Sequence, residues 1–166
     1  MRPTLLGVLR TAYLVLAALL TATLLPRLGV PPAWVPDLVL VGVVATAVLR
    51  GPVHGALAGL LAGWVVELVP PVGTPLGLMP LVTMLAGFVA GLFRRSSSRS
   101  WVRAPAALLC AAAVVLAGRV ASAVLAEGGV ELAVDATRLV ATLVLGAMLL
   151  PALLVVDRAL VRRRLG

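Results

Sequence analysis

The segment PDLVLVGVVATAVLRGPVHGALAGLLAGWVVELVPPVGTPLGLMPL, residues 36–81, sets the architecture that we expect for this chain. Glycines recur in it at every fourth position, and Glu67 follows one step later; the glycines are Gly51, Gly55, Gly59 and Gly63. Residues four apart lie on nearly the same face of a helix, so the pattern predicts a helix with a groove free of side chains. Small residues let membrane helices approach closely. We therefore expect a helix-packing seam, within the chain or with a partner.

The composition is that of an integral membrane protein. Of the 166 residues, 62% are hydrophobic and 12% are charged, and the mean hydropathy is +1.17. A soluble domain is about 45–50% apolar and about 25% charged. We expect one all-α domain with six transmembrane helices, over residues 5–25, 34–49, 52–69, 76–93, 104–126 and 136–156, and a basic tail over 157–166. Ala18 and Ala22 give the first helix a second small-residue face for packing or for a partner.

The positive charges orient the chain. The net charge of +8 comes from fourteen arginines, which lie mainly between the hydrophobic runs. With six spans, most of them share one side, and arginine-rich loops face the cytoplasm. We therefore expect a multi-pass protein of the inner (cytoplasmic) membrane with both termini in the cytoplasm. The basic loops suit anionic lipid and not nucleic acid; they contain Arg94, Arg95, Arg99, Arg103, Arg162, Arg163 and Arg164.

This topology places four charged residues in one outer layer: Asp37, Glu67, Arg119 and Arg138. A charge at the bilayer centre costs about 2.5–3.5 kcal/mol on insertion scales, and pairing offsets part of that cost. Our hypothesis is an ion pair between Glu67 and Arg119, because Arg119 lies well inside its predicted membrane helix. The alternative for Asp37 and Arg138 is that they lie at helix ends and extend their charged groups to water.

No catalytic or metal-binding set is evident in the sequence. The only histidine, His54, starts the predicted third helix, and the only cysteine, Cys110, lies in an apolar run. Neither has partners at metal-ligand spacing, and the common hydrolase and nucleotide-binding motifs are absent. We expect a protein that is not an enzyme and that carries no metal and no cofactor.

The order of several short motifs resembles the MreD family of bacterial rod shape-determining membrane proteins. These motifs are Pro36-Asp37-Leu38, Arg50-Gly51, Gly55-x3-Gly59-x3-Gly63-x3-Glu67, and Pro70 to Gly77-Leu78. Glu67 stands where that family more often has aspartate. The resemblance implies a non-enzymatic scaffold of the machinery that builds the lateral cell wall. The implied partners are MreC and, through it, RodA, a class B penicillin-binding transpeptidase and MreB.

A different class of function remains open. The MreD family is similar in span number and topology to the substrate-binding subunits of energy-coupling-factor vitamin transporters, which bind a ligand in the outer half of the membrane. The charged layer would suit such a pocket. Aromatic residues make up only 4% of the chain, whereas pockets for ring-shaped vitamins usually stack the ring on aromatic side chains. A small membrane enzyme is the third alternative, without a catalytic set to support it.

Overall fold

The computed structural model describes residues 13, 16, 29, 31, 34–68, 77–94, 103–125 and 132–162. The secondary structure of these residues is helical and contains no strand, which confirms the all-α prediction for them. The helices are α3 (Leu38–Arg50), α4 (Pro52–Leu68), α5 (Leu78–Leu92), α6 (Arg103–Leu125) and α7 (Leu132–Arg162). The predicted helix over 5–25, with Ala18 and Ala22, lies almost wholly outside the described residues, as do Arg95, Arg99, Arg163 and Arg164.

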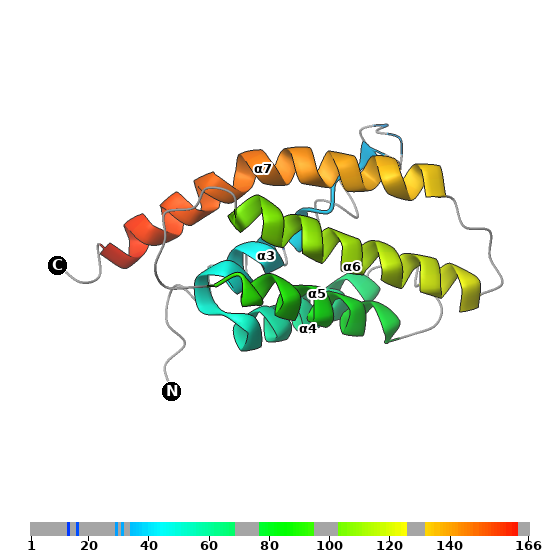
Figure 1. The fold of residues 1–166 in the computed structure, drawn as a ribbon, viewed down its shortest axis with the longest axis horizontal. Coiled ribbons are helices and arrows are strands. Elements are labelled where there is room, and N and C mark those ends of the chain that lie inside the picture. The colour runs from blue at the N-terminus through cyan, green and yellow to red at the C-terminus, as the bar shows by residue number, and fades with distance from the viewer. Residues whose placement is uncertain are drawn as a thin grey trace.

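Helix α3 is the centre of the bundle. It packs against α4, α5, α6 and α7, and most of its side chains are buried. Figure 1 shows α7 along one side and the α4–α5 pair along the other, with α6 between them. The principal core forms where α3 meets α5, α6 and α7; its fully buried members include Val41, Val44, Ala86, Leu108 and Leu150. This packing brings the start of α3 next to α6 and α7, where the polar site lies.

Helix α3 begins after a capping aspartate and ends at a glycine. Asp37 caps its N-terminus, because its side-chain Oδ1 accepts a hydrogen bond from the Leu40 N–H at 3.0 Å. Gly51 ends the helix with a φ of +98°, a conformation that glycine adopts without a Cβ clash. Pro52 then opens α4 at the first helical position, where the missing N–H costs nothing. The predicted ranges 34–49 and 52–69 therefore differ from the observed helices only at their ends.

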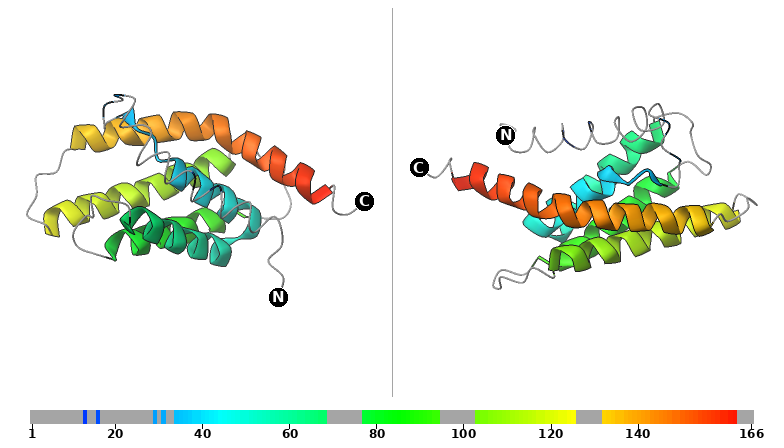
Figure 2. Two further views of the ribbon diagram at one scale, coloured as in Figure 1. Left: turned by 180° about the vertical axis from the view of Figure 1, so that it is seen from behind. Right: turned by 90° about the horizontal axis from the view of Figure 1, so that it is seen from above.

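Helix α7 departs most from the prediction. It has 31 residues and a length of about 47 Å at 1.5 Å per residue. We expected a helix over 136–156 and a separate tail from 157, which is wrong, because the helix continues to Arg162 with Pro151 inside it. A proline removes one backbone hydrogen bond, and a helix can continue through it with a kink. Figures 1 and 2 show the last turns of α7 extending beyond the other helices.

Two of the described helices are long and apolar enough to cross a membrane by length and composition. They are Arg103–Leu125 and Ala133–Leu153. Helices α3, α4 and α5 are apolar but shorter, with 13, 17 and 15 residues. A straight helix of about 20 residues is needed to cross a hydrocarbon core of about 30 Å. The described residues thus support membrane association through two candidate spans.

Candidate functional site

The glycine ladder of α4 packs directly against α5. A Cβ on Gly55 would collide with the backbone of Gly87, and a Cβ on Gly59 would collide with the backbone of Thr83. A Cβ on Gly63 would lie 2.5 Å from the Cα of Pro80. Each of these contacts is far inside van der Waals distance, so no larger side chain fits at the three positions. The two helices therefore touch backbone to backbone, which is the close approach that small residues permit.

Helix α5 contributes its own small residues to this seam. Gly87 and Gly91 are four residues apart and face α4, where a Cβ on Gly91 would meet Pro52. Thr83 Oγ1 is 2.8 Å from the carbonyl oxygen of Gly59 and can donate a hydrogen bond across the seam. The sequence prediction did not include Thr83, Gly87 and Gly91, although their four-residue spacing is the same signal as that of the α4 ladder.

The seam is filled by the chain itself. Gly55, Gly59 and Gly63 are buried under α5, so their face is not open to a second protein in this fold. Gly51 does not belong to the ladder, since it precedes α4 and forms the turn after α3. Its nearest neighbour is the side chain of Arg94, whose Cδ and Nη1 would both lie 3.0 Å from a Cβ at this position.

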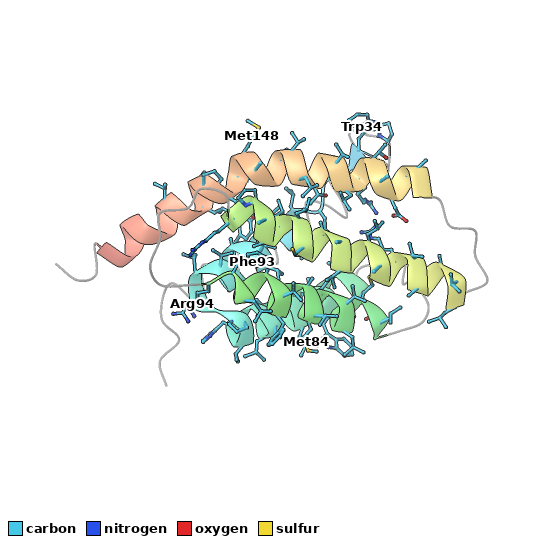
Figure 3. The ribbon with its side chains drawn as sticks, in the orientation of Figure 1. Trp34, Met84, Phe93, Arg94 and Met148 are labelled. Atoms are coloured by element: carbon cyan, nitrogen blue, oxygen red, sulfur yellow. The ribbon has the colours of Figure 1, made fainter. Side chains whose placement is uncertain are left out.

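Arg94 connects the end of α5 to the end of α3. Its Nη1 donates a hydrogen bond to the carbonyl oxygen of Arg50 at 2.9 Å. A cation at the C-terminal end of a helix satisfies a free carbonyl and interacts favourably with the helix dipole. Figure 3 shows Arg94 at the end of the bundle where α3 and α5 terminate, with Trp34 farther along the molecule beside the first half of α7. Arg103, at the start of α6, and Arg162, at the end of α7, are the other cytoplasmic-loop candidates within the helices.

Three of the four predicted outer-layer residues meet in one polar cluster. Arg119 on α6 lies between two carboxylates, with its Nη2 3.9 Å from Asp37 Oδ2 and its Nη1 3.4 Å from Asp135 Oδ1. Arg138 on α7 donates from Nε to the carbonyl oxygen of Val35 at 3.2 Å. The side chains of Arg119, Asp37 and Asp135 are each about three-quarters shielded from solvent. The cluster joins α3, α6 and α7 at the end where α3 begins.

Thr142 completes the connection between α3 and α7. It is buried, and its Oγ1 accepts a hydrogen bond from the backbone N–H of Asp37 at 2.9 Å. The same hydroxyl donates to the carbonyl oxygen of Arg138, one turn earlier in α7, at 2.8 Å. A hydroxyl has one donor and two acceptor positions, so Thr142 uses its donor and one of its acceptor positions. Thr142 therefore fixes the position of the α3 N-terminus on α7.

A small cleft opens between these polar groups. It is lined by Asp37, Leu40, Ala112, Val115, Leu116, Arg119, Asp135, Arg138, Leu139 and Thr142. The centres of water molecules can occupy about 30 Å³ of it, and one water needs about 10–15 Å³ by this measure. The cleft thus has room for a few waters or for small charged groups.

Glu67 lies elsewhere, and the hypothesised pair with Arg119 is wrong. Glu67 Oε1 accepts a hydrogen bond from the backbone N–H of Gly77 at 2.6 Å, and Gly77 is the N-cap of α5. Glu67 follows the glycine ladder by four residues, so its side chain extends on the face that packs on α5 and not toward α6. The similar depth predicted for the two residues did not mean that their side chains lie on facing surfaces.

The Glu67 carboxylate stabilises the start of α5. The first N–H groups of a helix have no partner within the helix and attract negative charge. Only 8% of the residue is exposed, and its second oxygen, Oε2, has no hydrogen-bond partner. One carboxylate oxygen thus connects the last turn of α4 to the first turn of α5.

The sequence prediction missed Asp135 and Thr142 as members of the polar cluster. Asp135 precedes the helix predicted over 136–156, whereas it lies in the first turn of α7. The spacing Asp135, Arg138, Thr142 follows the i, i+3, i+7 pattern of one helix face and could have been found from it.

Comparison of the chain with protein-family models, curated proteins and solved structures gave no match. Within the described ranges 34–68, 77–94, 103–125 and 132–162, no group of three or more histidine, cysteine, aspartate or glutamate residues could hold a metal ion.

Proposed function

We propose that this chain is a multi-pass membrane scaffold of the MreD type, which acts in cell elongation by docking MreC-type partners. The observation that carries the proposal is the internal organisation of residues 36–68 and 77–81. Several described residues of the motif that resembles the MreD family have a structural role: Asp37 caps α3, Gly51 forms the turn, and three glycines form the seam. A segment built around helix packing suits a scaffold.

The outer surface of α4 supports insertion into a bilayer. Large apolar side chains lie exposed on the face opposite the glycine seam; they are Val53, Leu57, Leu61, Trp64 and Leu68. Contiguous apolar patches of this kind are rare on soluble monomers. In a bilayer, lipid tails would cover this stripe and keep its apolar side chains away from water.

The other helices have exposed apolar side chains as well. On α5 they are Leu81, Leu85, Phe88 and Leu92, and on α7 they include Val140, Val144 and Met148, which is 73% exposed. Figure 3 shows Met84 and Met148 pointing outward from opposite sides of the bundle. Apolar residues therefore face outward on both sides, as expected for a protein surrounded by lipid.

The distribution of charge supports the proposed orientation. Helix α3 runs from Asp37 to Arg50, and α5 ends beside Arg94. Glu67 lies at the opposite end of the α4–α5 pair. Arginines thus gather at one end of these helices and carboxylates at the other, which the positive-inside rule assigns to the cytoplasmic and outer sides. The six-span topology expected from the sequence would place both termini on the cytoplasmic side as well.

The partner surface would be one of the exposed helix faces, since the glycine seam is already occupied. A partner with a single membrane helix, such as MreC, would pack along the outward stripe of α4. RodA, its transpeptidase and MreB would join through MreC. The vitamin-transporter alternative is less well supported, because the polar cleft holds only a few water-sized groups.

The test is purification of the tagged protein from its own host in mild detergent, with identification of the proteins that accompany it. We expect MreC to be recovered. Leu57→Gln with Leu61→Gln should reduce its recovery, whereas the matched pair Val144→Gln with Met148→Gln on α7 should not. Recovery of transporter ATPases in place of MreC would refute the proposal.

A further inference from the structure

The polar cleft between α3, α6 and α7 has matched charges. Two carboxylates, Asp37 and Asp135, and two guanidiniums, Arg119 and Arg138, line it. A simple anion in the cleft would meet both carboxylates, and a simple cation would meet both guanidiniums. At these short distances, like charges repel as strongly as opposite charges attract. A ligand that carries one charge of each sign is the class that all four groups can bind.

The groups of the cluster do not saturate one another. Arg119 lies 3.4 Å from Asp135 and 3.9 Å from Asp37, whereas charge-assisted N–H···O bonds are about 2.7–2.9 Å long. A guanidinium has five N–H donors. Within the described part of the chain, the Arg138 guanidinium has one hydrogen bond, from Nε to Val35 O. Donors and acceptors of both signs thus remain available beside the cleft.

The size and lining of the cleft narrow the ligand further. Its room for water centres, about 30 Å³, corresponds to two or three water-sized groups. An ammonium and one or two phosphate or carboxylate oxygens fit this space, and the other atoms of such a ligand would lie at the open mouth of the cleft. Apart from Thr142, the remaining lining is apolar and suits the carbon atoms between two charged groups; it consists of Leu40, Ala112, Val115, Leu116 and Leu139.

We propose that this cleft binds a zwitterion with a primary ammonium and an anionic group a few bonds apart. The ammonium donates to Asp37 and Asp135, and the anionic group accepts from Arg119 and Arg138. The phosphoethanolamine head group of a phospholipid has this chemistry, and so does free phosphoethanolamine. Binding at the cleft is a property beyond the scaffolding role and does not depend on it.

The experiment is thermal unfolding of the full-length protein, purified in maltoside detergent and freed of lipid. Phosphatidylethanolamine, phosphatidylcholine and phosphatidylglycerol are added at equal mole fractions, and soluble phosphoethanolamine is added separately. At 100 times its Kd, phosphatidylethanolamine should raise the Tm by about 5 °C or more. Phosphatidylcholine has no ammonium N–H, and phosphatidylglycerol has no ammonium, so both should give clearly smaller shifts.

Two variants assign the effect to the cleft. Asp135→Asn and Arg138→Gln should each reduce the phosphatidylethanolamine shift to that of phosphatidylglycerol. Arg94→Gln, at the other end of the bundle, is the matched control and should keep the full shift. If a cleft variant fails to fold, native mass spectrometry of the wild-type protein provides the second measurement, with preferential retention of phosphatidylethanolamine expected.

The outcomes separate the sources of the ligand. A shift with phosphatidylethanolamine alone assigns the cleft to a lipid head group, and an equal shift with soluble phosphoethanolamine assigns it to a free zwitterion. Equal shifts with all three lipids, without any shift from soluble phosphoethanolamine, would overturn the proposal. So would a phosphatidylethanolamine shift that persists unchanged in both cleft variants.

Discussion

Glu67 Oε1 accepts a hydrogen bond of 2.6 Å from the backbone N–H of Gly77 and so connects the C-terminal turn of α4 to the N-cap of α5. The same two helices are in contact along the glycine seam. The seam and the hydrogen bond act together, because the seam sets the spacing at which a glutamate reaches the next helix.

We predict that Glu67→Gln retains most of the stability and that Glu67→Leu does not. Glutamine keeps a carbonyl oxygen that accepts from Gly77, whereas leucine leaves that partly buried N–H without a partner, at a cost of about 1–3 kcal/mol. Thermal unfolding in detergent measures the difference. Equal unfolding of the two variants would show that the hydrogen bond does not stabilise the helix pair.

The close packing of the seam predicts that adding one methyl group there lowers the stability of the protein. Gly59→Ala should destabilise the protein by about 1–3 kcal/mol or more, because the new Cβ would collide with backbone atoms of Thr83 that cannot rotate away. Leu61→Ala, on the exposed face of the same helix, is the control and should change stability by less than about 0.5 kcal/mol. A Gly59→Ala protein as stable as the control would contradict the backbone contact.

The hydroxyl of Thr83 should contribute measurably to the same seam. Thr83→Val removes the hydroxyl that can donate to Gly59 O, and we expect a loss of about 0.6 kcal/mol, the average between membrane helices, and of no more than about 1.7 kcal/mol. Thr83→Ser keeps the hydroxyl and should retain the bond. Denaturant titrations give the unfolding free energies of the two variants. If the serine variant were as unstable as the valine variant, the loss of stability would be due to packing and not to the hydrogen bond.

Arg119 should couple to Asp135 and not to Glu67. A double-mutant cycle of Arg119→Leu with Asp135→Leu should give an interaction energy of about 0.5–3 kcal/mol, because the two side chains are in contact. The parallel cycle with Glu67→Leu should give additive effects. Unfolding free energies from denaturant titrations supply both cycles, and additivity in the first would contradict the ion pair.

The hydrophobic runs predicted the positions of α3 to α6 within a few residues. Prolines and glycines separate the runs of α3, α4 and α5, and an arginine- and serine-rich segment separates the runs of α5 and α6. Helix α7 was predicted too short. Pro151 and the charged pair Asp157-Arg158 resemble the end of a helix in sequence, yet none of them prevents the helix from continuing when the following residues favour it.

The polar site was predicted only in part. Asp37, Arg119 and Arg138 were predicted to share one layer, and they line the same cleft. Glu67 was predicted to join them, but it lies between α4 and α5. Topology gives the depth of a residue, but the pairing of side chains depends on which helix faces meet. The position of Glu67 on the ladder face contained that information, since the close approach to another helix was itself predicted for this face.

Depletion of the protein in its own host, with fluorescent labelling of new peptidoglycan, tests the proposed role in cell elongation most directly. We expect wall synthesis along the lateral surface to be lost, cells to become shorter and rounder, and the wild-type gene to restore both. Normal shape and lateral wall synthesis after depletion, with reduced uptake of a vitamin, would contradict the scaffold and favour a transporter subunit.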